Sequence, residues 1–235
     1  MPDEPAPPNR ERDALRRAAS PVMLGAVRKA AAAITERVEL LYFGSDDFPS
    51  ASLDTLQLCQ MLLEAGPSIR LVVFDSRSDE AKCREHGVLF FPTLVILGKN
   101  RGSLRFLGTP SGHGLPVLVA ALQEASTGLS GLGPVIRRRA AAIKRPLVLR
   151  VFISPEMEYC KRPALFALRL AVENEHIRSE VVNHIDFPVL SQRYKIGTAP
   201  RTIVNDGVEI GGALAEARFL EEIFSALVPQ VRPYS

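Results

Sequence analysis

The residues best suited to chemistry lie in one segment, where a cysteine follows a methionine three positions earlier. The segment is Ser154-Pro-Glu-Met-Glu-Tyr-Cys160. It follows an apolar run, residues 147–153, that is typical of a strand, and it opens a helical pattern that continues to Asn174. A thiol at a helix start can ionise because the helix dipole stabilises a thiolate, and a thiolate can exchange with disulfides. Met157 is a thioether and has no proton to lose, so only Cys160 could act in this way.

The elements that would position this segment occur twice along the chain. Residues 92 and 200 are both prolines, lie 108 positions apart and each precede a strand pattern. Each half shows β-α-β and then β-β-α order, which predicts an α/β fold with a mixed sheet flanked by helices. The expected strands are 38–44, 69–75, 94–97 and 103–107, then 147–153, 178–185, 201–205 and 208–211. The expected helices are 53–65, 78–86 and 114–125, then 157–174, 188–195 and 215–227.

This element order, with a proline loop after each second helix, resembles the thioredoxin fold. The tandem arrangement resembles the two-domain protein disulfide oxidoreductases, also called glutaredoxin-like proteins, over about residues 20–230. A related tandem module opens the flavoprotein subunit of alkyl hydroperoxide reductase. The resemblance implies two tandem thioredoxin-like domains, at 21–126 and 134–230, after a flexible N-terminal tail at 1–20. Leading helices are expected at 21–37 and 134–144, and the Gly- and Ser-bearing stretch 126–133 is the expected link.

In this family a Cys-x-x-Cys pair opens the first core helix. Its first cysteine attacks a disulfide of the substrate, and its second cysteine resolves the mixed disulfide that forms. The alignment of motifs places Met157 at the attacking position and Cys160 at the resolving one, which is largely buried in the family. Burial and the charges of Glu156 and Glu158 would disfavour a thiolate at Cys160. Cys160 is thus interpreted either as an inert buried residue or as a single redox thiol. The matching slots of the first half, Phe48-Pro-Ser-Ala51, contain no sulfur.

The resemblance also implies a cis-proline facing each motif. The expected cis bonds are Phe91-Pro92 and Ala199-Pro200, because proline makes a cis bond tolerable. In the family, the backbone before that proline pairs with an extended peptide or with glutathione. Tyr159 and Thr198 are expected to join Ala199 and Pro200 in binding such a peptide.

A pair of glycines, Gly211-Gly212, resembles the Gly-Gly of glutaredoxins, whose amides hold a glutathione carboxylate at a helix start. A simple turn is the other interpretation. Glutathione is therefore the one possible small-molecule partner, and no bound cofactor is expected.

Composition excludes several classes of protein. The chain is 46% hydrophobic and 23% charged with a net charge of +3, which is globular and gives little support to nucleic-acid binding. No apolar run approaches the ~18 residues that a membrane span needs. The first ten residues lack a secretory core, so a cytoplasmic location is expected. The cysteines and histidines lack metal-ligand spacing, so no metal site is expected.

The other cysteines and the main basic cluster have ordinary structural interpretations. Cys59 lies among leucines and is expected to be buried filler, whereas Cys83 lies between charged residues and is expected to be partly exposed. Their helices should cover opposite faces of a sheet, so a disulfide between them is improbable. Arg137-Arg-Arg139, with the basic pair at 144–145, is either a solvated helix face or a docking patch for an acidic partner.

Three functions are consistent with these observations. The first is a non-catalytic or weakly catalytic relative of the disulfide oxidoreductases that binds a protein or peptide partner. The second is a thiol-disulfide oxidoreductase that uses Cys160 alone, with a partner thiol or glutathione completing the exchange. The third is a chaperone-like module that holds peptides at its proline-loop edges.

Overall fold

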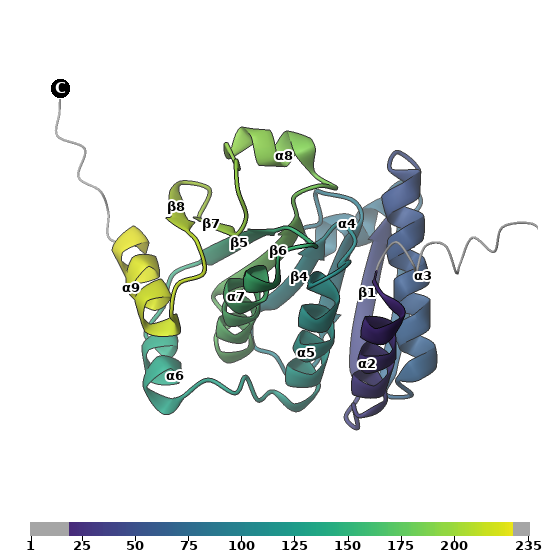
Figure 1. The fold of residues 1–235 in the computed structure, drawn as a ribbon, viewed down its shortest axis with the longest axis horizontal. Helices are drawn as coiled ribbons and strands as arrows, with labels where there is room; N and C mark the ends of the chain where they lie inside the picture. Colours follow the sequence, from purple (N-terminus) through teal and green to yellow (C-terminus); the bar gives the residue numbers. More distant parts are fainter. Residues whose placement is uncertain (1–18, 228–235) are drawn as a thin grey trace, which may run out of the picture.

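Eight strands form one mixed sheet within residues 19–227, which are the residues that this computed structural model describes (Figure 1). The order across the sheet is β2-β1-β3-β4-β6-β5-β7-β8. The strands are β1 Val38–Gly44, β2 Ile69–Asp75, β3 Thr93–Leu97, β4 Ser103–Leu107, β5 Leu147–Ile153, β6 Ile177–Asn183, β7 Arg201–Val204 and β8 Val208–Gly211. The helices are α2 Pro21–Ala32, α3 Pro49–Ala65, α4 Glu80–Glu85, α5 Gly114–Thr127, α6 Pro134–Ala141, α7 Lys161–Glu173, α8 Pro188–Arg193 and α9 Glu216–Leu227, with a 3-10 turn η1 at Glu158–Cys160.

The two halves of this sheet have the same strand order, as the repeat in the sequence predicts. The first half reads β2-β1-β3-β4 and the second reads β6-β5-β7-β8. In both halves the first two strands are parallel and the others are antiparallel. The structure therefore confirms an α/β fold built from two thioredoxin-like halves.

The halves are joined by a strand pairing that the sequence did not predict. Strand β4 pairs in parallel with β6, with Ser103 opposite Arg178 and Leu107 opposite Val182. This pairing makes one continuous sheet from two four-stranded units. Backbone groups of β4 that would otherwise form an exposed sheet edge are satisfied by the second half.

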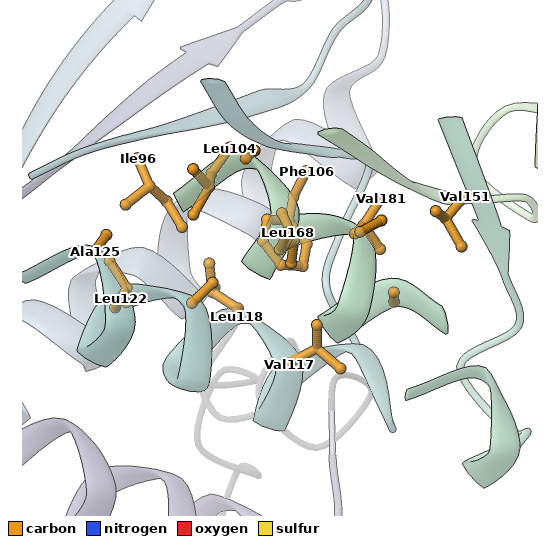
Figure 2. Packing of buried hydrophobic residues seen from close by; sticks show 14 of the residues in the cluster. Ile96, Leu104, Phe106, Val117, Leu118, Leu122, Ala125, Val151, Leu168 and Val181 are labelled. Carbon is orange, nitrogen blue, oxygen red and sulfur yellow. The ribbon is translucent and has the colours of Figure 1, made fainter. Parts of the chain in front are cut away.

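One face of the sheet is covered by long helices and holds most of the core. Strand residues alternate between faces, so Leu40 and Tyr42 face this core while Leu41 and Phe43 face away from it. Helices α5 and α7 pack side by side against the strands at the centre of the sheet (Figure 2). The residues labelled there are Ile96, Leu104, Phe106, Val117, Leu118, Leu122, Ala125, Val151, Leu168 and Val181.

Among residues 19–227, the helices on the other face are the short α4 and α8, each over a small apolar cluster. Cys83 of α4 packs with strand residues of the first half, and Leu190 of α8 belongs to a cluster with strand residues of the second half and Leu107 of β4. In Figure 1, α8 lies on the opposite side of the strands from α5 and α7. The cluster under α8 crosses the junction of the halves, because it contains Leu107 of β4, Phe152 of β5 and Val182 of β6.

A ladder of charged residues lies beside that cluster and also crosses the junction of the halves, since Arg105, Arg150 and Glu180 each stand two positions before one of its strand residues. Glu180 is the register partner of Arg105 on β4 and of Arg150 on β5. Its carboxylate lies 2.8 Å from Nε of Arg150 and 3.3 Å from Nε of Arg178. Arg105 instead donates to the backbone carbonyls of residues 86 and 87. Buried charges require such partners, because an unpaired charge away from water is costly.

Several element boundaries differ from the sequence-based expectations. Helix α3 begins at Pro49 rather than at residue 53, because the fixed φ of proline suits a first helical position. The helix expected at 157–174 is divided: Met157 is extended, residues 158–160 form η1, and α7 begins at Lys161. The leading helices α2 and α6 end at Ala32 and Ala141, five and three residues before their expected ends.

The expected ends of the chain fall mostly outside the described residues. Of the tail predicted at 1–20, only Ala19 and Ser20 are described. Ala19 is buried, and the Ser20 hydroxyl accepts a hydrogen bond from the Met23 amide as the cap of α2. The predicted boundary at residue 230 also lies outside them. Within residues 19–227, no helix is long and apolar enough to cross a bilayer.

Candidate functional site

The motif of the second half lies where β5 passes into η1 and then α7. The amide of Met157 donates to the carbonyl of Ser154, and the amide of Cys160 donates to the carbonyl of Met157 at 3.1 Å. These two tight turns lead the chain from the sheet to the helix. Positions 157 and 160 are therefore one short turn apart, as a Cys-x-x-Cys pair requires.

Burial makes the single thiol of this motif weakly acidic. Only 1% of the Cys160 surface is exposed, and the residue belongs to the main hydrophobic core. Burial raises the pKa of the Cys160 thiol, and a backbone hydrogen bond at Ser154 opposes this only in part. The neighbouring Glu158 is paired with Lys161 at 2.8 Å, so its charge is largely compensated. Desolvation, rather than the nearby acids, is thus the main obstacle to a thiolate.

Met157 and Tyr159 form the outer surface of this motif. Met157 is half-buried and packs against the core, and Tyr159 is exposed. The Tyr159 hydroxyl donates to the Met157 sulfur at 2.9 Å. A thioether accepts such a bond but cannot ionise, so this pair can contact a partner but cannot exchange a disulfide.

The two proline loops have the geometry that the sequence predicted. The Phe91-Pro92 and Ala199-Pro200 bonds are both cis. Ala199 is buried in the same core cluster as Cys160. Thr198 is exposed, and its hydroxyl accepts from Arg201 at 3.2 Å.

The glycine pair differs from the glutaredoxin arrangement that its sequence suggested. The amide of Gly212 donates to the carbonyl of Pro200 at 3.1 Å, and α9 begins only at Glu216. Gly211 is the last residue of β8, and Gly212 has a φ of +76°. The pair therefore closes the end of the β7–β8 hairpin against the proline loop, and it does not open a helix.

The motif of the first half carries an exposed aromatic ring in place of sulfur. Phe48 stands immediately before α3, as Met157 stands before η1, and 50% of its surface is exposed. Ser52 stabilises this turn, since its hydroxyl donates to the carbonyl of Ser45 at 2.9 Å. Tyr42 adds a 2.8 Å bond to the carbonyl of Ser52, and burial raises the pKa of that phenol to about 12.

A pocket of about 390 Å³ opens beside this first motif, and both halves of the chain line it. Its lining is mainly aromatic and aliphatic, with one acid and one arginine. The lining residues are Phe48, Leu89, Phe90, Phe91, Asp186, Phe187, Pro188, Val189, Leu190 and Arg193. Apart from Phe91, the residues of this pocket were not predicted to bind a ligand, because segments that are far apart along the chain combine to form it. The apolar run at 88–91 was the available signal.

A hydrogen-bonded network at Asp186 fixes the wall of this pocket. Oδ2 of Asp186 accepts from the amide of Thr109 at 2.6 Å and from the side chain of Asn183 at 3.0 Å. The Thr109 hydroxyl also lies 3.0 Å from that of Thr55 on α3. Burial raises the pKa of Asp186, although these bonds favour its ionised form. The network ties α3, the loop after β4 and the start of α8 together across the two halves.

The loop after β4 also contacts the motif of the second half. The amide of His113 donates to the carbonyl of Pro155 at 2.8 Å. Gly112 has a φ of +50°, and a Cβ there would lie 2.2 Å from the same carbonyl oxygen. Only glycine allows this close approach. The first half therefore helps to position the residues that precede Met157.

The other cysteines confirm one expectation and correct another. Cys59 and Cys83 are free and belong to clusters on opposite faces of the sheet, so they cannot form a disulfide. Cys83 was expected to be partly exposed, and this was wrong: it is 5% exposed, packed against Leu41 and Phe43. The charged neighbours that suggested exposure point elsewhere on a helix of only six residues.

Part of the basic cluster on α6, the second leading helix, makes contacts within the protein. Arg137 lies 3.7 Å from the carboxylate of Glu173, and the guanidinium of Arg139 lies 5.3 Å from the ring centre of Phe224. Two of the three arginines thus contact neighbouring helices. Among the described residues, no cluster of histidine, cysteine and carboxylate side chains could hold a metal ion.

Comparisons with known proteins agree with this geometry. Residues 148–225 match the thioredoxin domain family. A protein disulfide oxidoreductase from Aeropyrum pernix is 27% identical, with a TM-score of 0.79 over 88% of this chain and 93% of that one. The NTD_N/C domain of alkylhydroperoxide reductase AhpF from Enterococcus faecalis is 22% identical, with a TM-score of 0.77 over 87% and 99%. No curated protein matches the sequence. The chain thus has the tandem fold of the thioredoxin-fold protein disulfide oxidoreductases.

Proposed function

We propose that this protein is a low-activity or non-catalytic member of the disulfide oxidoreductases that binds a protein or peptide partner without exchanging a disulfide. One observation carries the proposal. Met157 occupies the attacking position, and the remaining sulfur, Cys160, is 1% exposed in the hydrophobic core. Exchange needs an accessible thiolate, and neither residue supplies one.

Binding is supported by the surfaces that remain at both motifs. Both proline loops contain cis bonds, with exposed Thr198 beside the second in sequence and exposed Phe48 in one pocket with Phe91 of the first, and the motif of the second half exposes Tyr159. Exposed aromatic groups beside a rigid backbone edge suit the capture of an extended peptide. A chaperone-like holding role would use the same edges.

The test of this function is the reactivity of the three cysteines in the folded protein. Cys59, Cys83 and Cys160 are all buried, so a small disulfide reagent should modify none of them quickly before denaturation and all three after it. The protein should also reduce insulin disulfides no faster than a Cys160→Ser variant does. One fast-reacting thiol that disappears in Cys160→Ser would contradict the proposal.

That contradictory result would favour the second function, a single-thiol oxidoreductase. One observation supports this alternative, since a backbone hydrogen bond at Ser154 lowers the pKa of Cys160 against the effect of burial. The thiolate would attack a glutathione or partner disulfide, form a mixed disulfide and release one thiol. A second thiol would then have to resolve it. Mass spectrometry of the glutathione-treated protein would detect that adduct on Cys160.

A further inference from the structure

The pocket beside Phe48 has fixed walls and an exposed apolar rim. Phe90 and Phe187 meet edge to face, with ring centres 6.0 Å apart, and Phe187 is buried. The rim is different, because Leu89 and Val189 are each 79% exposed. Exposed apolar groups gathered around a concave site mark a place where a ligand or partner binds.

The charged residues in the lining of this pocket are one acid, Asp186, and one base, Arg193. Burial together with the charge of Asp54 raises the pKa of the Asp186 carboxyl group. Arg193 is the basic residue of the lining, and its guanidinium already lies 5.5 Å from the ring centre of Tyr194. A cation beside Asp186 would stabilise a carboxylate that burial disfavours.

We propose that this pocket binds an extended segment of a partner protein in which a bulky apolar side chain stands next to a lysine or arginine. The apolar side chain enters between Phe90, Phe187 and Leu190, and the basic side chain lies near Asp186. The inference rests on the proposed binding function and names the chemistry of the partner.

Size and shape favour this occupant over others. At about 390 Å³ the pocket is near the lower end of ligand sites, which span about 300–1,000 Å³, so it suits one side chain and adjoining backbone. A second copy of the chain is less suitable. In a two-fold dimer the same patch meets itself, so the pocket would face a second pocket rather than a side chain that fills it.

Binding is tested with fluorescein-labelled hexapeptides of glycine and serine that carry a central pair: Phe-Lys, Phe-Gln or Ala-Lys. Fluorescence anisotropy with the full chain should show Phe-Lys binding about ten-fold more tightly than Ala-Lys, since one bulky side chain is buried. The Phe-Lys peptide should bind about three-fold more tightly than the Phe-Gln peptide in low salt, and this preference should shrink at high ionic strength. The peptides contain no cysteine, so the result is independent of the redox test of the proposed function.

Matched variants locate the site. Leu89→Gln and Val189→Gln should each weaken Phe-Lys binding about three- to ten-fold, because the apolar rim is lost. Their controls, Leu129→Gln and Val135→Gln, alter exposed apolar residues outside the pocket and should leave binding unchanged. Asp186→Asn should remove the preference for Phe-Lys over Phe-Gln and keep the preference over Ala-Lys. Its control is Glu64→Gln, at the far end of α3 from Phe48.

Three results would overturn the inference. The first is equal binding of Phe-Lys and Ala-Lys, and the second is a lysine preference that survives in Asp186→Asn. The third is a dimer, seen by sedimentation of the wild-type chain, that Val189→Gln dissociates, because this would assign the pocket to a second copy.

Discussion

The two halves share one strand order but carry different residues where the first core helix of each begins. In the first half Phe48 stands before α3 and is exposed at the rim of a pocket. In the second half Met157 stands before η1, and the thiol of Cys160 is buried. The first motif thus exposes an apolar ring, whereas the second holds its thiol in the core.

This difference shows that the fold does not depend on the sulfur atoms of its motifs. In each half a strand delivers the motif to the start of a helix, and the neighbouring strand leads from a cis-proline. Strand pairing and helix packing set these positions, since they bury far more surface than a single side chain can. The motif residues and their local turns are therefore free to differ while the strands and helices around them keep the same arrangement.

The largest expected effect is the restoration of chemistry in the second half. Met157→Cys places a thiol one short turn before Cys160, with the backbone bond from residue 160 to residue 157 already formed. The variant should form a 157–160 disulfide on mild oxidation and reduce insulin at least about ten-fold faster than wild type, because a partly exposed thiol can ionise. Mass spectrometry and a dithiothreitol-coupled insulin assay measure both outcomes.

The equivalent cysteine pair can be introduced in the first half and compared with the pair in the second. Phe48→Cys with Ala51→Cys should also form a disulfide, since position 48 directly precedes α3. The same variant should lose the pocket rim and with it the binding of apolar peptides. A folded Met157→Cys protein without a 157–160 disulfide would show that only the fold of the second motif, and not its fine geometry, has been kept.

The next effect concerns the junction that makes the halves one sheet. Glu180→Gln removes the carboxylate that pairs Arg150 and Arg178 beside buried Arg105. We expect the free energy of unfolding to fall by about 1.5–3 kcal/mol, because buried Arg150 loses one of its two carboxylate partners and keeps Asp206. Urea denaturation followed by circular dichroism measures the change. Glu209→Gln, which breaks the more exposed pair with Arg201, should cost less than about 1 kcal/mol. Similar losses in both variants would show that the ladder does not stabilise the junction.

The sequence predicted the elements well because each half carries clear hydrophobic periodicity and a proline at the same place. Strands β1, β2 and β5 begin and end at the expected residues. The pairing of β4 with β6 was not predicted, because β4 has an ordinary strand pattern and its local sequence does not identify the neighbouring strand. Arg105 and Glu180 were the available signal, as charged residues at otherwise buried strand positions.

The site was predictable only where its residues are close in sequence. The positions of Met157, Cys160 and both cis-prolines follow from local motifs. The pocket depends on residues 186–193 approaching Phe48 and Phe90, a contact set by tertiary packing alone. The burial of Cys83 escaped prediction for a related reason, because a six-residue helix is too short to show which face it buries.

A smaller effect on stability is expected when the buried thiols of the two halves are removed. If Cys160 now acts as core filler, Cys160→Ala and Cys59→Ala should each lower the free energy of unfolding by about 1 kcal/mol, the contribution of one buried group. Both belong to the main hydrophobic core. A stabilising effect of Cys160→Ala alone would show instead that the fold tolerates this thiol at a cost, as expected of a functional group.

The smallest effect is the pH dependence that Asp186 gives to the junction of the halves. Burial raises the pKa of this carboxyl group in the folded protein above its unfolded value. The folded state therefore binds the proton more tightly, so the contribution of Asp186 to stability is complete below the unfolded pKa and declines as the pH rises through the folded pKa. Asp186→Asn, which keeps an oxygen acceptor for the amide of Thr109, should flatten this decline. Thermal unfolding between about pH 3 and pH 8 should show wild type and variant converging at the acid end and the variant relatively more stable at neutral pH. A variant that loses stability at neutral pH would mean that the ionised carboxylate, through its bonds to Thr109 and Asn183, contributes more than its burial costs.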